Sequence, residues 1–258
     1  MFHHRTDLAG LGFAFTDRHG GVSLPPYDSL NLGRTDLDDP DAVGTNLQRV
    51  RAELGLAELP SGGPVVTLAQ IHSADVVEID RSRLTDWDDR SPLGSSGGRP
   101  PLVRADAMVT TLPQVALTIR VADCLPVVLA DRRAGVLGVA HAGRRGLVDG
   151  ILPRTVERMR ALGASDITAW IGPSICGACY EVPPEMAAEV SAVVPGSAST
   201  TSQGTTGLDL AAGAVRQLAD AGCPAEVVGG CTAEDRSLYS HRRDGPATGR
   251  LAGIAWLT

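Results

Sequence analysis

The chain has 258 residues, of which 43% are apolar and 21% charged, a balance typical of a globular protein and not of a disordered or membrane protein. Its formal net charge of -7 argues against a nucleic-acid-binding protein, which would need a basic surface. All 23 basic side chains are arginines, which excludes Schiff-base lysines, pyridoxal phosphate chemistry and the phosphate-binding lysine of a P-loop.

The length suits one large α/β domain, and no linker or repeat divides it, so we expect residues 1–258 to form a single domain. No apolar run approaches the ~20 residues that span a bilayer, and the N-terminal residues lack the order of a signal peptide. We therefore expect a cytoplasmic protein that contacts no membrane. The five cysteines, odd in number, are expected to be free thiols.

Short strands and helices are predicted along the first half of the chain. We expect a strand at 12–16, a helix from 39–41 to 54 that begins with a carboxylate cap and a proline, and strands at 65–68 and 76–79. Residues 82–104, rich in Gly, Pro and Ser, predict a surface loop.

The second half continues this alternation. The expected elements are strands at 115–121, 127–130 and 136–140, a helix at 152–162, a strand at 167–171, helices at 184–194 and 210–221, and strands at 226–229 and 251–257. Small polar residues predict a second loop at 195–207. The central strands are apolar throughout, as in strands covered on both faces, so the pattern predicts a layered α/β sandwich.

Three residues share one placement in this pattern. His72 follows a predicted strand, Cys124 lies in the turn between two strands, and His141 ends a strand. Sites assemble at strand ends in α/β folds, and two imidazoles with a thiolate suit zinc, with a fourth coordination position open. The spacings of 52 and 17 residues match no short motif. Packing or capping roles, or a metal-free Cys-His dyad as in thiol hydrolases, are the alternatives.

Other metal motifs are incomplete. Cys176-x-x-Cys179 is similar to half of a zinc knuckle or to a redox pair, but no second such pair exists, so we expect a packing role. No histidine is followed by x-Glu and no His-Glu-x-x-His occurs, which disfavours ordinary nucleobase deaminases and zincins. Six histidines are too few for a blue-copper laccase with its many copper ligands.

Two arginine pairs follow histidines: Arg144 and Arg145 follow His141, and Arg242 and Arg243 follow His241. Guanidinium groups suit a phosphate because their donors form a planar fork, although a solvated loop is the alternative. Among these four arginines, we expect Arg145 to bind such an anion.

Three aspartates flank the predicted site in sequence, namely Asp106, Asp123 and Asp131. A carboxylate near a ligating histidine often accepts a hydrogen bond from its second ring nitrogen. Aspartate also caps turns, which is its more frequent role. We expect either role for these three residues.

The chain resembles a known family in several runs that occur in order over nearly the whole length. The runs are SLNLG (29–33), DDPDAVGTN (38–46), QIHSADV (70–76), ADAMVTT (105–111), ADCLPVVLAD (122–131), HAGRRG (141–146), IGPSI (171–175), CYEV (179–182), CT (231–232) and YSHRRDGPATGR (239–250). They are similar to the YfiH (DUF152) family, also called the multicopper polyphenol oxidase family and now usually described as purine nucleoside phosphorylases. One departure is Arg144, where the family usually has Trp.

The resemblance implies a three-layer α/β sandwich with a mixed sheet, shared with cysteine-hydrolase-like toxins. It also implies that His72, Cys124 and His141 form a catalytic metal triad, with zinc or alternatively copper as the cofactor. The implied activity is phosphorolysis of adenosine, inosine, guanosine and S-methyl-5'-thioadenosine, with deamination of adenosine as a second activity.

The expected partners are therefore purine nucleosides and phosphate, with no nucleic acid and no membrane, in a monomer or small homo-oligomer. Three alternatives stay open: an amidase-like role in editing cell-wall precursors, a polyphenol oxidase with bound copper, and a metal-binding module with little turnover.

Overall fold

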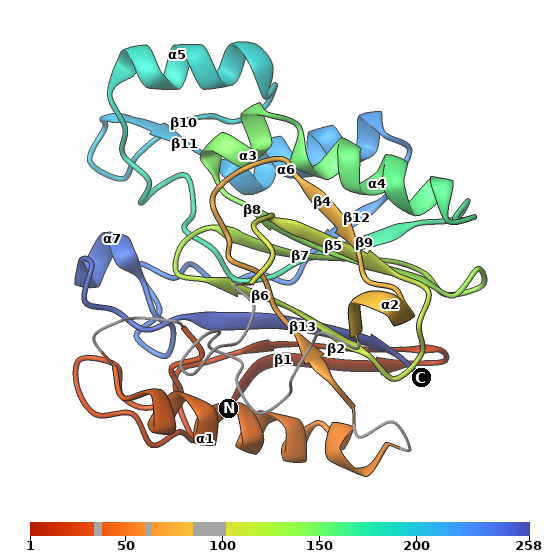
Figure 1. The fold of residues 1–258 in the computed structure, drawn as a ribbon. Helices are drawn as coiled ribbons and strands as arrows, with labels where there is room; N and C mark the ends of the chain where they lie inside the picture. Colours follow the sequence, from red (N-terminus) through yellow and green to blue (C-terminus); the bar gives the residue numbers. More distant parts are fainter. Residues whose placement is uncertain (34–37, 60–62, 85–101) are drawn as a thin grey trace.

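Two β-sheets lie face to face in the computed structural model, which describes residues 1–33, 38–59, 63–84 and 102–258 (Figure 1). The five-stranded sheet has, in spatial order, β1 (Phe2–Leu8), β2 (Leu11–Thr16), β13 (Leu251–Leu257), β6 (Ala116–Val121) and β3 (Val65–Val66). The six-stranded sheet has β12 (Ala225–Val227), β9 (Thr168–Ile171), β7 (Leu125–Asp131), β8 (Val136–Ala142), β5 (Ala107–Thr110) and β4 (Val76–Glu78). Both sheets are mixed, because β3–β6, β12–β9 and β4–β5 pair in parallel and the other neighbours pair antiparallel.

Helices cover the outer faces of both sheets, so the layers follow the order helix, sheet, sheet, helix (Figure 1). Helix α1 (Pro40–Glu53) lies on the five-stranded sheet, and α3 (Arg144–Val148), α4 (Ile151–Ala161), α5 (Pro184–Val193) and α6 (Leu210–Asp220) lie on the side of the six-stranded sheet. Shorter elements are η1 (Leu56–Glu58), α2 (Arg81–Leu84), α7 (His241–Asp244) and the hairpin of β10 (Ala198–Thr200) and β11 (Thr206–Leu208).

Three apolar cores separate the four layers, and β7 shows how one strand contributes to two of them. Val127 and Leu129 face the core beneath α3–α6, whereas Val128 and Ala130 face the core between the sheets. Alternate side chains of a strand point to opposite faces, so a strand with two buried faces is apolar at every position. A third core joins α1 to the outer face of the five-stranded sheet.

Local sequence signals explain the bounds of helix α1. The Asp39 side chain accepts a hydrogen bond from the backbone N–H of Asp41 at 2.9 Å, and Pro40 occupies the first turn, where its missing N–H costs no hydrogen bond. Gly55, with φ of 71°, follows the end of the helix in the left-handed conformation that glycine adopts without steric cost. This helix lies where its sequence predicts it.

The structure differs from the sequence expectation in the number of layers. The resemblance implied three layers around one mixed sheet, whereas two sheets pack against each other here and give four layers. An apolar run shows that a strand is covered on both faces, but it does not show whether a helix or another strand covers it. This is why the second sheet was missed.

Some elements were also missed in the sequence. Strands β1 and β5 were not predicted, and the hairpin β10–β11 overlaps the segment 195–207 that was predicted as a loop. Of the other predicted loop, 82–104, residues 85–101 lie outside the described residues. Across the described ranges, none of the helices combines the length and apolar character that crossing a membrane requires.

Candidate functional site

The fold brings His72, Cys124 and His141 together from three different segments. His72 lies between β3 and β4, Cys124 lies between β6 and β7, and His141 lies near the end of β8. One potential ligand atom from each residue lies within 4.8 Å of the others. Cys124 Sγ is 3.9 Å from His72 Nε2, and the two imidazole rings meet edge to face with centroids 4.8 Å apart.

The turn that carries Cys124 connects the two sheets, since β6 belongs to one and β7 to the other. Asp123 in this turn has φ of 88°, and its side chain accepts hydrogen bonds from Thr232 Oγ1 and from the backbone N–H of Arg242, both at 2.6 Å. His72 also has a positive φ, of 61°. A non-glycine residue in this region is strained and needs support from its surroundings. Of the three non-glycine residues with positive φ in the described ranges, His72 and Asp123 lie at the candidate site and Gln114 does not. Hydrogen bonds from Thr232 and Arg242 support Asp123.

Asp106 orients both histidine-bearing segments. Its fully buried carboxylate accepts a hydrogen bond from His141 Nδ1 at 2.7 Å, and further bonds from the backbone N–H groups of residues 71–73. Burial alone would raise the pKa of Asp106, but the hydrogen bonds from His141 and Ser73 outweigh burial and lower it to about 2. An ionised carboxylate only accepts, so Nδ1 of His141 carries a hydrogen, and Nε2 is available to a metal once it has lost its own proton.

Cys124 and His141 change each other's protonation. Burial raises the pKa of the Cys124 thiol, but the charge of His141 and hydrogen bonds from His141 and His72 outweigh it and lower the pKa to about 6. Burial lowers the pKa of His141, but the charge of Cys124 and the bond to Asp106 raise it to about 9. The thiolate is thus the favoured form, and the thiolate is the form of cysteine that binds metals.

Gly143 provides the space in which the two side chains meet. A Cβ atom at this position would lie 3.0 Å from Cys124 Sγ and 3.1 Å from His72 Cδ2. Both contacts would be tighter than ordinary van der Waals contact, so the glycine permits the observed geometry.

The three residues line a pocket of about 650 Å³. Four arginines also line it: Arg120, Arg144, Arg242 and Arg250. Ile175, Tyr180 and Leu210 provide apolar and aromatic surface, and the guanidinium carbon of Arg242 lies 5.0 Å from the centre of the Tyr180 ring. A pocket of this size with a few polar groups is typical of a site for a small organic ligand.

Comparison with known proteins agrees with this architecture. The profile of a family described as "Multi-copper polyphenol oxidoreductase laccase" matches residues 12–258. A protein named "Purine nucleoside phosphorylase YfiH" from Escherichia coli is 36% identical over 253 residues, which cover 96% of this chain and 94% of that protein. The chain belongs to the YfiH/DUF152 family.

Other family members also match this chain over nearly their whole length. "Purine nucleoside phosphorylase ORF3" from Streptomyces griseus is 48% identical over 262 residues, covering 100% of this chain and 99% of that protein. The crystal structure of a DUF152 protein from Neisseria meningitidis has a TM-score of 0.79 at 33% identity, covering 98% of both chains. That of YlmD from Geobacillus stearothermophilus has a TM-score of 0.83 at 31% identity, covering 96% of this chain and 92% of the other. The mixed α/β fold is therefore that of the YfiH/DUF152 family.

Two of the four arginines that were considered for phosphate binding line the pocket, and two do not. Arg144 and Arg242 line the pocket, whereas Arg145 is exposed and does not line it. Arg243 donates to the backbone carbonyls of residues 232, 235 and 238, which is a structural role. The assignment of phosphate to Arg145 stays a prediction that the pocket does not favour.

The three aspartates also differ in role. Asp106 is the hydrogen-bond partner of a histidine, whereas Asp131 accepts from backbone N–H groups in two turns at the other end of β7. Asp123 links the Cys124 turn to Thr232 and Arg242.

Arg120, Arg250 and Tyr180 are among the pocket residues that were not singled out in the sequence. Arg120 left a signal, because it is the one charged residue of the mostly apolar β6 segment ALTIRV. Arg250 and Tyr180 lie within runs that match the family, but nothing local distinguishes them from structural residues.

Proposed function

We propose that this chain is a purine nucleoside phosphorylase that acts on adenosine, inosine, guanosine and S-methyl-5'-thioadenosine in the pocket around His72, Cys124 and His141. The observation that carries the proposal is that one thiolate, two imidazoles and four arginines line a single pocket of about 650 Å³. The names of the relatives support the same activity.

Phosphorolysis defines what the pocket must do. A phosphate oxygen forms a bond to C1′ of the ribose while the bond from C1′ to N9 of the purine breaks, which yields the free base and ribose 1-phosphate. The site must therefore bind an anion, bind the departing purine and limit the access of water.

We assign the phosphate to Arg144. The chain has no lysine, so an anion depends on guanidinium groups or backbone N–H groups. Arg242 and Arg250 already donate to the backbone carbonyls of Glu181 and Thr248. The Arg144 side chain makes no hydrogen bond or ion pair with another residue in the described ranges, so its donors are available to a ligand.

The purine is assigned to the apolar part of the pocket formed by Ile175, Tyr180 and Leu210. An aromatic ring stacks on a purine, and a neighbouring guanidinium strengthens such a surface, as Arg242 does beside Tyr180. This places the base and the phosphate on surfaces of different character within one pocket.

The three donor side chains that line the pocket fit one divalent cation. His72, Cys124 and His141 would bind it, with Asp106 holding the His141 ring in the orientation that presents Nε2. Two imidazoles and one thiolate favour zinc, and copper is the alternative. When bound, the cation supplies Lewis acidity beside the nucleoside.

We also propose hydrolytic deamination of adenosine to inosine as a second activity of the same pocket. It is favoured by the placement of the three donor side chains in the same pocket as the proposed purine surface. Deamination needs no phosphate, so it does not depend on Arg144.

The test is product identification by chromatography after incubation with adenosine, with and without phosphate. We expect adenine and ribose 1-phosphate only when phosphate is present. Inosine should form under both conditions, and part of it should be cleaved to hypoxanthine when phosphate is present. The Cys124→Ala variant, purified in the same way, controls for contaminating host enzymes and should form neither product. Absence of all products from the wild-type protein would contradict the proposal and favour an amidase or a metal-binding module.

A further inference from the structure

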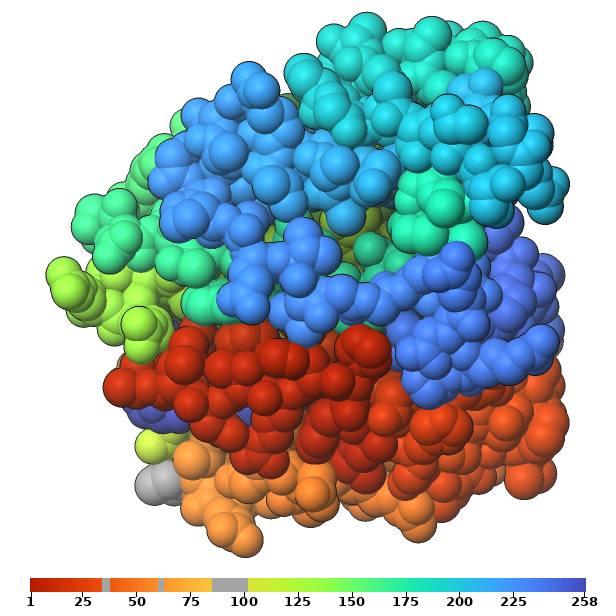
Figure 2. Space-filling view, turned by 180° about the vertical axis from the view of Figure 1, so that it is seen from behind, coloured from red at the N-terminus to blue at the C-terminus, as the bar shows by residue number. Residues whose placement is uncertain are grey.

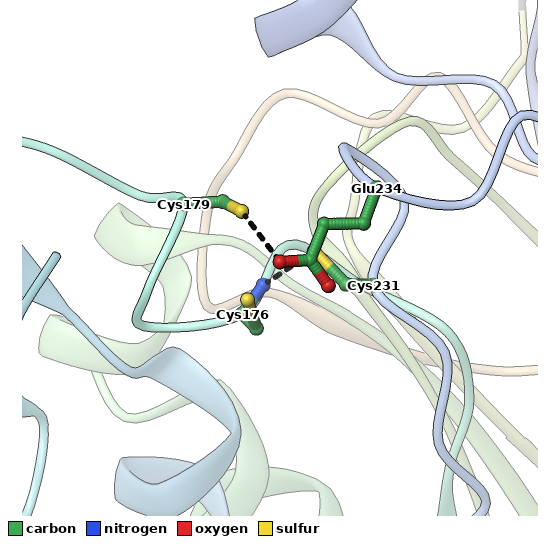
Figure 3. Close-up of side chains that lie close together, drawn as sticks. All are labelled: Cys176, Cys179, Cys231 and Glu234. Atoms are coloured by element: carbon green, nitrogen blue, oxygen red, sulfur yellow. Dashed lines mark hydrogen bonds between the residues drawn. The ribbon is translucent and has the colours of Figure 1, made fainter. Parts of the chain in front are cut away.

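A second cluster of metal-ligand residues lies outside the pocket and consists of Cys176, Cys179, Cys231 and Glu234 (Figure 3). One ligand atom from each lies within 4.8 Å of the others. Cys179 Sγ is 3.4 Å from Glu234 Oε1, and the backbone N–H of Cys176 donates to Cys231 Sγ at 3.4 Å. All four donors therefore point toward one small volume.

The backbone presents these donors in two matching turns. Cys176 and Cys179 are three residues apart in one turn, and Cys231 and Glu234 are three residues apart in the other. The N–H of Cys179 donates to the carbonyl of Cys176 at 3.0 Å, and the N–H of Glu234 donates to that of Cys231 at 3.2 Å. In sequence the Cys-x-x-Cys pair lacked its second half, and the structure provides it as Cys-x-x-Glu.

Backbone pairing fixes the two turns side by side. Ser174 and Cys231 form a parallel bridge, in which Ser174 N–H donates to the Gly230 carbonyl and Thr232 N–H donates to the Ser174 carbonyl, each at 3.1 Å. The segment that follows β12, blue in Figure 2, crosses the rear face between the helical layer and the red N-terminal strands. The relative position of the donors is thus set by the main chain.

The donor chemistry of the cluster suits a cation, because a metal binds cysteine as the thiolate and displaces its proton. Three thiolates and a carboxylate would carry four negative charges, and Glu234 forms no ion pair with an arginine or histidine in the part of the chain that the structure describes. The five cysteines form no disulfide. Like charges this close repel one another strongly in a half-buried site, and a bound divalent cation would offset much of this repulsion.

We propose that Cys176, Cys179, Cys231 and Glu234 bind one zinc ion, in a structural site separate from the pocket. Thiolates select zinc over hard cations, and four protein donors leave no open position for substrate. In a tetrahedron with Zn–S bonds of about 2.3 Å, neighbouring donors are about 3.8 Å apart, so the cluster needs to contract by at most about 1 Å.

The site would stabilise one side of the pocket. Ile175, next to Cys176, lines the pocket and donates its N–H to the carbonyl of Asp123 at 3.0 Å. Thr232, next to Cys231, donates to the Asp123 side chain at 2.6 Å. Both turns of the zinc site thus contact the strained residue that precedes Cys124.

The test measures zinc per chain in the Cys124→Ala background, which removes one donor of the pocket and so isolates the second site. We expect about one zinc ion per chain, with three sulfur neighbours by X-ray absorption spectroscopy. Adding Cys231→Ser should remove this zinc. Adding Cys223→Ser should leave it in place, because Cys223 is buried outside both clusters. No zinc in the Cys124→Ala protein, or zinc retained after Cys231→Ser, would overturn the proposal.

A second measurement needs no folded variant of the cluster. In the wild-type protein, Cys176, Cys179 and Cys231 should resist alkylation by iodoacetamide until a zinc chelator is added, as followed by peptide mass spectrometry. Equal alkylation with and without chelator would contradict the site. So would a disulfide between two of these cysteines in protein denatured without reductant. The result does not depend on nucleoside turnover, so the zinc-site proposal is tested independently of the proposed function.

Discussion

Asp106 Oδ1 lies 2.7 Å from Nδ1 of His141, and the same carboxylate accepts backbone hydrogen bonds from the segment that carries His72. One buried carboxylate therefore orients one imidazole directly and the other through its main chain. Cys124 needs no such partner, because the turn between the two sheets positions it. Asp106 is a positioning residue, and its effect should be visible in metal affinity.

Replacing Asp106 with Asn should lower the affinity of the pocket site for zinc by about 10- to 100-fold, as is usual when a carboxylate partner of a ligating histidine is lost. The Asn side chain can donate to Nδ1 of His141 and so favour the tautomer in which Nε2 carries the hydrogen. Competition with a chromophoric chelator measures the affinity. Asp75→Asn is the matched control, because Asp75 is an exposed carboxylate in the same segment. Equal affinities for the two variants would refute the positioning role.

Replacing Gly143 with Ala should weaken zinc binding at the pocket site without removing a donor side chain. The added Cβ would contact Cys124 Sγ at 3.0 Å and His72 Cδ2 at 3.1 Å, so one of these side chains must move. The φ of -81° at Gly143 is accessible to alanine, so we expect little backbone strain. Calorimetric titration with zinc should show a loss of affinity, while the thermal unfolding midpoint of the metal-free protein changes little. Unchanged affinity would mean that the donors are not close-packed around the ion.

Arg144→Ala and Arg145→Ala form a matched pair on the same short helix. Arg144 lines the pocket and Arg145 does not. Loss of a charge-assisted bond to phosphate should reduce adenine formation by roughly 10- to 100-fold in Arg144→Ala, and inosine formation much less. Arg145→Ala should behave like the wild-type protein. Adenine measures phosphorolysis, and the sum of inosine and hypoxanthine measures deamination, all in one chromatogram. If Arg145→Ala instead shows the selective loss of adenine formation, the phosphate belongs to Arg145 as its sequence position suggested.

Asp131 makes stability depend on pH. Burial would raise the pKa of Asp131, but backbone N–H groups of residues 133, 134, 165 and 166 donate to its carboxylate and lower the pKa. In Asp131→Asn the amide N–H₂ faces two of these donors, and we expect a loss of roughly 2–4 kcal/mol in the free energy of unfolding at neutral pH.

The sign of the pH dependence follows from this lowered pKa. The stabilisation by Asp131 is fully present above its unfolded pKa of about 3.9, and it is lost as pH falls through the lower folded pKa. Urea unfolding of both proteins from about pH 7 to about pH 3 should therefore show a difference that narrows below about pH 4. A constant difference over this range would rule out the ionised carboxylate as its source.

Much of the fold could be predicted from local patterns. The apolar runs around β6, β7 and β8 and the cap and proline of α1 placed these elements within a few residues of their observed bounds. Strand β1 could not be found in this way, because its side chains FHHRTDL are mostly half-buried and show no clear alternation. Pairing with β2, and not the strand's own pattern, explains why this segment is extended.

The candidate metal ligands, like the elements of the fold, could be predicted only in part from the sequence. His72, Cys124 and His141 could be proposed because apolar runs end beside them, and strand ends assemble sites. Cys231 and Glu234 could not be joined to Cys176 and Cys179, because 55 residues separate Cys176 from Cys231 and only the bridge beside Ser174 brings the two turns together.

By itself, then, the sequence determined the central strands and the longer helices, the position of His72, Cys124 and His141 near strand ends, and the absence of lysine for binding anions, because periodicity, caps and composition act over a few residues. Only the tertiary structure decided that two sheets pack to give four layers, that Arg144 and not Arg145 faces the pocket, and that a second set of donors converges. These features depend on contacts between segments far apart in the chain, and packing of the sheets and backbone bridges selects those contacts without leaving a local pattern.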